Sequence, residues 1–269
     1  MIKNLNYFIL KSYQEMYLYI YLLIGLFMFI NLYNYRTDFI GKKFFWNWII
    51  YALNQPLTAN FVIPILFIIT TSTLLSKLLI NDEITIRLSN RFNIWKVNIS
   101  VILLNTINFI ITMTLIILLL SFSIMNIQTN WNSSSINSFQ SSFNGLSPFH
   151  SIPIVQVLMS IVLFSLFLLF WGIVNQILTS MFKNKATPIF IVTFLLIFQG
   201  KVNTIPGFPD YLVKILPENY FLLYSDISSD IFHLTNIYQK FWIDILYWVI
   251  LISISSIILM IIYRRKQFK

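Results

Sequence analysis

Six long apolar runs constrain this chain more than any other feature of its sequence. A helix that crosses about 30 Å of hydrocarbon needs roughly 20 apolar residues. Stretches of about this length lie near residues 16–34, 59–80, 99–125, 152–178, 182–199 and 241–262. The chain is 58% hydrophobic and only 10% charged. The sequence therefore predicts an all-α polytopic membrane protein with six transmembrane helices, formed by residues 1–269 as a single transmembrane domain.

The basic residues indicate which way the predicted helices run. An even number of spans puts both termini on one side, and that side then holds twelve of the 18 Lys and Arg residues. Basic residues favour the cytoplasmic face, so we expect a multi-pass protein of the cell membrane with both termini cytoplasmic. The net charge of +9 is then a topology signal that implies contact with membrane lipid and no nucleic acid.

Motifs that carry chemistry are missing from the sequence. There is no Cys, and the two histidines, His150 and His233, fall in predicted loops without clustered partners, where a solvated side chain is the simpler interpretation. Neither HExxH, GxSxG nor GxxxxGK[ST] occurs. We therefore expect no catalytic residue, metal site or cofactor, and any energy source must be bound by another polypeptide. The many Asn, Ile, Lys, Phe and Tyr residues are typical of an AT-rich genome, as in low-GC Gram-positive bacteria.

A few polar residues interrupt the predicted spans. In the third span, Asn105, Asn108 and Thr112 are spaced i, i+3 and i+7, which places them on one helical face. Asn175 and Gln176 lie near the inner end of the fourth span. Such residues either bond across helix interfaces, which is the favoured interpretation, or line a path. No Asp or Glu lies at the centre of a span, which disfavours a proton- or sodium-coupled carrier.

Three further segments have a composition of their own. Residues 1–15 place apolar and polar side chains on opposite helical faces, which predicts an interfacial helix or, alternatively, a slightly amphipathic tail. Residues 44–53 are apolar but about half a bilayer long, which favours an interfacial aromatic segment or an outward extension of the second span. Residues 126–150 are rich in Ser and Asn without Lys, Arg, Asp or Glu, so we expect a mobile outer loop.

Residues 200–240 form the last predicted outer segment. The apolar patches YLVKIL and YFLLY are separated by Pro217 and follow the turn-prone sequence IPGFPD, which contains Pro206 and Pro209. This pattern favours two short half-helices that dip into the outer leaflet and return, the second of them starting beside Glu218. A plain surface loop packed on the ends of the spans is the alternative.

The segment between the second and third spans, residues 81–98, is the most informative part of the chain for function. It gathers charged residues and one Trp between two apolar runs: Asp82, Glu83, Arg87, Arg91, Trp95 and Lys96. A charged helical segment that is tethered at both ends to membrane spans can transmit force to or from a cytosolic partner. The alternative is a loop whose charges only fix the topology.

These features together resemble the permease subunits of ABC-2-type transporters. In that family the segment after the second span is a coupling helix, with an acid near its start, a basic pair, and then the entry to the third span. Residues Glu83, Arg87, Arg91 and Lys96 match this layout, although Ile84-Thr85-Ile86 stands where the family often has Gly. The resemblance implies a dimer of permeases, formed by two copies or with a homologous partner. It also implies two cytosolic ABC ATPase subunits that bind ATP and Mg.

The resemblance also implies what such a permease moves. Compact members export bacteriocins, lantibiotics or cytolytic peptides, and the aromatic-rich, uncharged spans favour an amphipathic peptide or lipid-like substrate. The broken element with Pro206, Pro209, Pro217 and Glu218 would then be an outer gate. The alternatives are export of a polysaccharide or drug, and a non-transport membrane anchor or sensor that recruits a cytosolic partner through residues 81–98.

Overall fold

The computed structural model of the chain describes residues 19–35, 44–54, 57–80, 91–122, 130–142, 151–182, 184, 186–202, 205, 208–221, 223 and 237–265. These residues form helices and connecting turns and no β-strand, as expected for an all-α membrane protein. The predicted interfacial helix at residues 1–15 lies outside the described residues.

Among the described residues, three helices are long and apolar enough to cross a membrane, namely α5 (Arg91–Phe122), α7 (Pro153–Met181) and α12 (Ile237–Arg265). With 29 to 32 residues each, they are about 43–48 Å long, which exceeds the hydrocarbon thickness of a bilayer. Shorter apolar helices cover Tyr19–Tyr35, Ile63–Ser76 and Ala186–Gln199. The three long helices support a membrane protein, whereas crossing by the three shorter ones stays a prediction.

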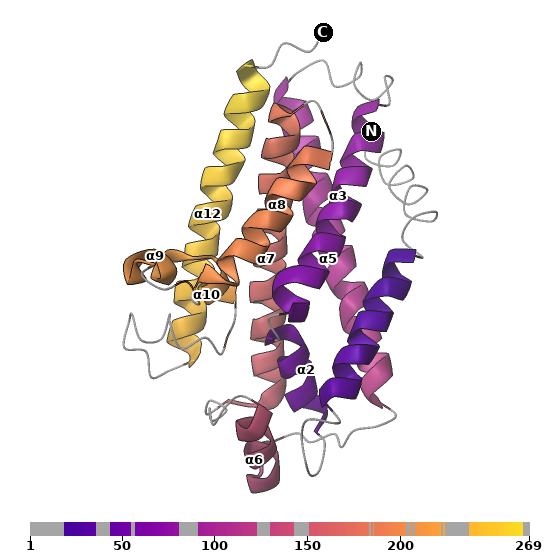
Figure 1. Ribbon diagram of the computed structural model, residues 1–269, viewed down its shortest axis with the longest axis vertical. Coiled ribbons are helices and arrows are strands. Elements are labelled where there is room, and N and C mark those ends of the chain that lie inside the picture. Colours follow the sequence, from indigo (N-terminus) through magenta and orange to yellow (C-terminus); the bar gives the residue numbers. More distant parts are fainter. Residues whose placement is uncertain are drawn as a thin grey trace.

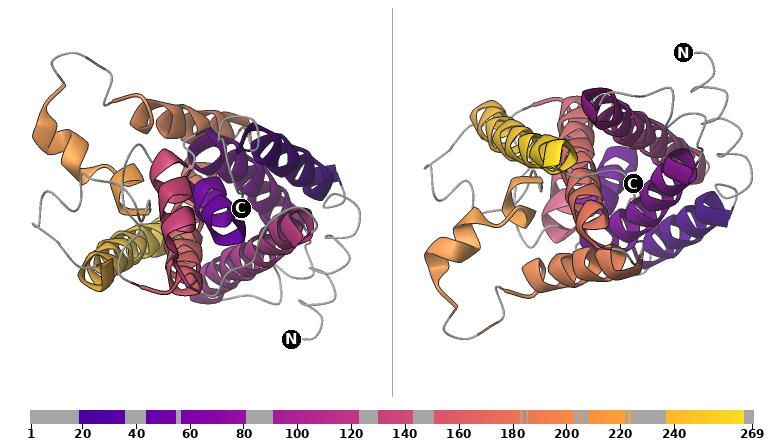
Figure 2. Two further views of the ribbon diagram at one scale, coloured as in Figure 1. Left: turned by 90° about the horizontal axis from the view of Figure 1, so that it is seen from below. Right: turned by 90° about the horizontal axis from the view of Figure 1, so that it is seen from above.

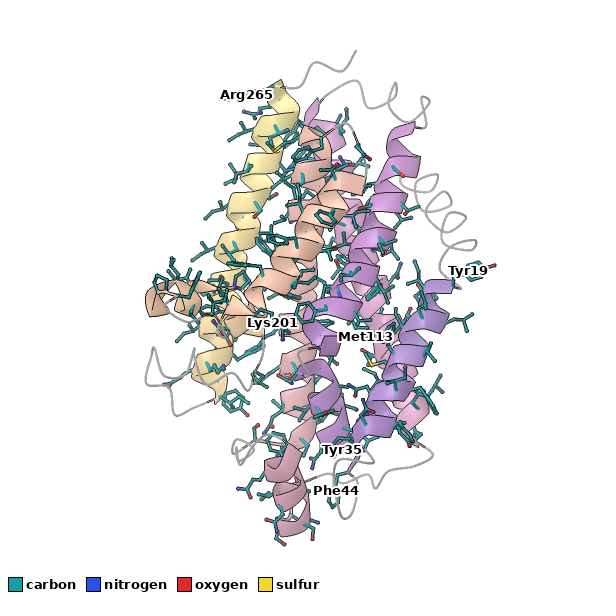
Figure 3. All side chains as sticks on the ribbon, in the orientation of Figure 1. Tyr19, Tyr35, Phe44, Met113, Lys201 and Arg265 are labelled. Atoms are coloured by element: carbon teal, nitrogen blue, oxygen red, sulfur yellow. The ribbon has the colours of Figure 1, made fainter. Side chains whose placement is uncertain are left out.

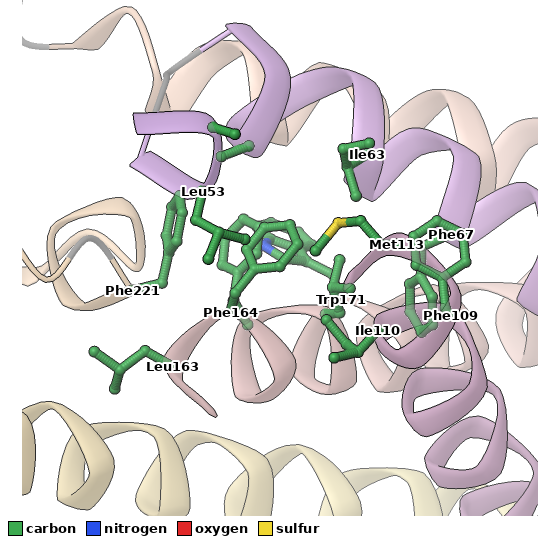
Figure 4. Packing of buried hydrophobic residues seen from close by; sticks show 14 of the residues in the cluster. Leu53, Ile63, Phe67, Phe109, Ile110, Met113, Leu163, Phe164, Trp171 and Phe221 are labelled. Carbon is green, nitrogen blue, oxygen red and sulfur yellow. The ribbon is translucent and has the colours of Figure 1, made fainter. Parts of the chain in front are cut away.

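Helix α7 lies at the centre of the bundle (Figures 1 and 2). The helices packed against it are α12, α5, α2 (Phe45–Asn54), α3 (Ile63–Ile80) and α8 (Ala186–Gln199). Large buried side chains of α7 fill the space between these helices (Figure 4), among them Leu163, Phe164, Phe167 and Trp171. Because α7 packs against both of the other long helices, α5 and α12, its side chains contact residues of each.

A glycine sets the closest approach to α7. A Cβ added at Gly172 would lie 2.7 Å from Ile102 Cγ2 on α5 and 3.2 Å from Phe67 Cε1 on α3. Only a residue without a side chain allows both helices to pack this tightly. Gly172 therefore fixes the junction of α3, α5 and α7 at one point.

The second predicted span is a broken helix. Helix α2 ends at Asn54, a π-helical turn, η1 (Leu57–Val62), follows, and α3 continues from Ile63. Trp48 and Ile50 of α2 are fully buried, so this segment packs inside the bundle. The buried Asn47 of α2 donates to the Ser135 carbonyl at 2.9 Å, so its amide nitrogen has a partner inside the protein. Helix α2 precedes η1 and α3 directly in the chain, as in the alternative of an outward extension of the second span.

The Ser- and Asn-rich segment between α5 and α7 contains a ten-residue helix, α6 (Ser133–Ser142). Asn132 and Ser135 cap its first turn reciprocally: the Ser135 N–H donates to Asn132 Oδ1 at 2.8 Å, and the Asn132 N–H donates to Ser135 Oγ at 2.9 Å. Phe139 is fully buried and lies edge-on to Trp131, 5.5 Å away between ring centroids. Composition alone does not predict this helix, because it depends on one cap and one buried ring.

Candidate functional site

The charged segment leads directly into the longest helix. Residues 81–90, with Asp82, Glu83 and Arg87, lie outside the described residues. Helix α5 begins at Arg91 and runs without a break to Phe122, so residues 91–98 are its first two turns and no separate element ends at residue 98. No Gly or Pro stands between residues 91 and 122, so nothing in the sequence ends the helix between the two predicted segments.

Side chains near the start of α5 attach it to α12. The Trp95 indole N–H donates to the Ser256 carbonyl at 3.1 Å. The Trp95 ring stacks on the Phe92 ring with centroids 5.3 Å apart. Lys96 lies with its Nζ 4.5 Å from the centre of the Phe92 ring, which is a cation–π distance. Of the predicted coupling residues, Trp95 thus contacts another helix, whereas Lys96 is exposed.

A tyrosine joins three long helices one turn further along. Asn98 Nδ2 on α5 donates to the Tyr263 hydroxyl of α12 at 2.6 Å, and Gln176 Nε2 on α7 donates to the same oxygen at 2.7 Å. All three side chains are buried, with at most 3% of their surface exposed. Hydrogen bonds between buried groups hold helices in one register, so α5, α7 and α12 are tied at the same level.

Two further amides connect α3 to its neighbours. Asn105 Nδ2 on α5 donates to Thr71 Oγ1 at 2.8 Å and to Thr70 Oγ1 at 3.2 Å. Asn175 Nδ2 on α7 donates to Ser72 Oγ at 2.7 Å. The interface interpretation thus accounts for Asn105, Asn175 and Gln176.

The other two residues of the predicted polar face are placed differently. Asn108 is exposed, and Thr112 donates to the Asn108 carbonyl at 2.9 Å within its own helix. The i, i+3, i+7 spacing gives a shared direction but not a shared neighbour, because α3 covers only the edge of that face that carries Asn105.

Two short helices follow α8, and the second of them packs against α12 and α7 (Figure 1). They are α9 (Asp210–Ile215) and α10 (Glu218–Phe221), with Pro209 before the first helix and Pro217 between the two. Asn219 Nδ2 donates back to the Val213 carbonyl at 2.6 Å, which folds α10 against α9. Pro206 and the side chain of Glu218 lie outside the described part of the chain.

Aromatic contacts dock α10 on the long helices. Tyr220 and Tyr247 stack with centroids 3.8 Å apart and planes 10° apart, and Phe221 stacks on Phe167 at 4.2 Å. The Trp248 indole N–H donates to the Tyr220 carbonyl at 3.0 Å, and the Tyr247 hydroxyl donates to the Ile215 carbonyl at 2.7 Å. These bonds satisfy irregular backbone at the side of the bundle.

A buried charge pair next to α10 was not singled out from the sequence. Asp244 and Lys240, one turn apart on α12, are 0% and 1% exposed. Burial raises the pKa of Tyr220, and the nearby Asp244 carboxylate raises it further. The sequence does contain a feature that indicates this site, namely two ionisable residues four positions apart at the start of an apolar run.

The described residues contain no group of three or more His, Cys, Asp or Glu side chains that could hold a metal ion. Comparisons with known families, with curated proteins and with solved structures gave no match. A functional assignment therefore depends on two regions of this chain, the helix junction at Tyr263 and the aromatic region around Asp244.

Proposed function

We propose that this chain is the membrane-spanning subunit of an ATP-driven exporter that moves an amphipathic peptide or lipid-like substrate outward. A separate cytosolic ABC ATPase, present in two copies, would bind and hydrolyse ATP. A second permease, either another copy or a homologous chain, would complete the transporter. Both termini and the charged segment would face the cytoplasm, and six helices would cross the bilayer.

One observation carries this proposal, namely the continuity of α5 from Arg91 to Phe122. A push on the charged segment at its start would move the helix as one body, because a helix transmits axial displacement through its backbone hydrogen bonds. The hydrogen bonds from Trp95 and Asn98 to α12 would pass that displacement to α12. The bond from Gln176 of α7 to Tyr263 of α12 would pass it on to α7. The ATPase would thus act on three long helices through one contact.

The interior of the bundle favours an apolar or amphipathic cargo. Aromatic rings pack on one another in the centre of the bundle, including Phe164, Phe167, Trp171, Phe221 and Trp248. In the proposed exporter, α9 and α10 close the outer end of the path, with Pro209 and Pro217 allowing the sharp changes of direction. Aromatic surfaces bind apolar side chains and acyl chains with little need for hydrogen bonds.

The first test identifies the partner and its contact. The tagged chain is purified from its native membranes, and the co-purifying cytosolic proteins are tested for ATP hydrolysis. Reversing the charge of the exposed Lys96 (Lys96→Glu) should lower recovery of the ATPase at least tenfold. The same change at Lys201, an exposed residue on the opposite side of the bilayer in this topology, should leave recovery unchanged.

Both variants should reach wild-type levels in the membrane, because exposed side chains contribute little to folding. Recovery of a kinase in place of an ATPase would support the sensor alternative and contradict the exporter. Equal ATPase recovery with Lys96→Glu and wild type would show that the start of α5 is not the contact.

A further inference from the structure

The outer part of α12 holds an ionisable group inside the protein. Asp244 is completely buried, and neither of its carboxylate oxygens has a hydrogen-bond partner among the described residues. A carboxylate that is withdrawn from water without hydrogen bonds carries a large desolvation penalty. Ionisable residues within membrane segments typically face the bundle interior and mark the path of a ligand or ion. Asp244 has no role in the helix junction at Tyr263.

Aromatic residues of two elements lie near this carboxylate. Tyr220 of α10 lies close enough to Asp244 for the carboxylate charge to raise the pKa of the Tyr220 hydroxyl. Tyr247 stacks on Tyr220 with ring centroids 3.8 Å apart. One turn beyond Asp244, Trp248 lies edge-on to Phe167 of α7 at 5.8 Å. A carboxylate next to aromatic faces is the arrangement that proteins use for organic cations, since both attract positive charge and the rings also bind apolar surface. An inorganic cation is less suited, because the described residues offer no cluster of further acidic ligands.

A basic residue, Lys240, lies close enough to Asp244 for the two side chains to interact electrostatically. It stands one turn earlier on the same helix and is itself buried. A ligand that brings its own cation to Asp244 would have to compete with the Lys240 ammonium. Removal of the Lys240 charge should therefore favour the ligand, whereas removal of the Asp244 charge should exclude it.

We propose that Asp244 is the anchor of a binding site for an amphipathic organic cation, whose charged group pairs with the carboxylate and whose apolar part lies against Tyr220, Tyr247 and Trp248. Helix α10 covers this site through the Trp248–Tyr220 hydrogen bond, so the ligand enters when α9 and α10 move away from α12. That this ligand is the exported cargo rests on the proposed function, whereas binding itself does not.

Two probes of the same shape and opposite charge test the site. The chain is purified in a neutral detergent, and binding of tetraphenylphosphonium and of tetraphenylborate is measured by equilibrium dialysis against protein-free micelles. Tetraphenylphosphonium should bind at least tenfold more tightly than tetraphenylborate. Asp244→Asn should weaken tetraphenylphosphonium binding at least tenfold and leave tetraphenylborate unchanged, and Lys240→Met should tighten tetraphenylphosphonium binding several-fold.

Asp244→Glu keeps the charge and should retain cation binding, which preserves the test if Asp244→Asn does not fold. Equal affinity of wild type for the two probes would overturn the proposal, as would an unchanged affinity for the cation in Asp244→Asn. A parallel loss of both probes in that variant would assign Asp244 a purely structural role. No ATPase or transport is required, so failure to find an ATPase partner would contradict the exporter and leave this result standing.

Discussion

At the scale of single residues, Tyr263 is the side chain on which most of the helix junction depends. Its hydroxyl accepts a hydrogen bond from Asn98 and another from Gln176, so one oxygen serves two buried amides on different helices. In a protein interior, a buried donor without an acceptor costs about 1–3 kcal/mol, although partners found in the unfolded state lower this figure in membranes. Removal of this oxygen atom should therefore weaken the contacts among three helices, α5, α7 and α12.

Tyr263→Phe should lower the free energy of unfolding by about 1–2 kcal/mol, because the amides of Asn98 and Gln176 lose their shared acceptor. Tyr19, with 70% of its surface exposed, provides the matched control, and Tyr19→Phe should leave stability unchanged. The measurement is thermal or denaturant unfolding of the purified chain in one detergent. Equal stability of Tyr263→Phe and wild type would mean that the hydroxyl contributes nothing to the junction.

At the scale of elements, close helix packing depends on where the chain has no side chain. Gly172 lies opposite Ile102 and Phe67, whereas Gly25 of the helix Tyr19–Tyr35 has nothing within 4 Å of an added Cβ. The two glycines cannot be distinguished from the sequence, since each stands inside an apolar run. The difference arises only when α3 and α5 are placed against α7.

These two glycines give a prediction with opposite signs. Gly172→Ala should destabilise the protein by about 1–3 kcal/mol, because the new methyl group meets Ile102 Cγ2 at 2.7 Å and forces the helices apart. Gly25→Ala should be neutral or stabilising by up to about 1 kcal/mol, since Ala restricts the unfolded chain and nothing blocks its methyl group. Both variants are compared with wild type by unfolding in the same detergent. A neutral Gly172→Ala would show that α3 and α5 can separate freely.

At the scale of the whole molecule, hydrophobicity predicts the helices but not their breaks or partners. The runs near residues 99–125, 152–178 and 241–262 correspond to the three long helices, because more than 20 consecutive apolar residues leave no other stable conformation in lipid. The π-helical turn η1 at the start of the second span was not predicted, and the packing of α2 against α7 depends on how the helices are placed in the bundle.

The polar sites show the same limit. Asn175 and Gln176 were predicted as interface residues from their position, but their partners, Ser72 and Tyr263, depend on how each helix is rotated in the bundle. The sequence does not predict a buried carboxylate at Asp244, because the residue lies near the end of an apolar run, where an exposed carboxylate is common. Its complete burial depends on how other elements pack against α12, among them α10 from another part of the chain.

The orientation of the whole bundle is open to a direct test. Ser134 is exposed on α6, which lies at the end of the bundle where α7 begins (Figure 1), and Asn184 is exposed just after the other end of α7. Figure 3 shows Arg265 of α12 at that other end of the bundle. In the proposed topology, Ser134→Cys should react with a membrane-impermeant thiol reagent on intact cells, and Asn184→Cys should react only after lysis. The chain has no native Cys that would confuse the labelling. Because α7 alone separates the two positions, labelling of both on intact cells would contradict a membrane crossing by α7, and the reverse pattern would place the charged segment outside the cell, out of reach of a cytosolic ATPase.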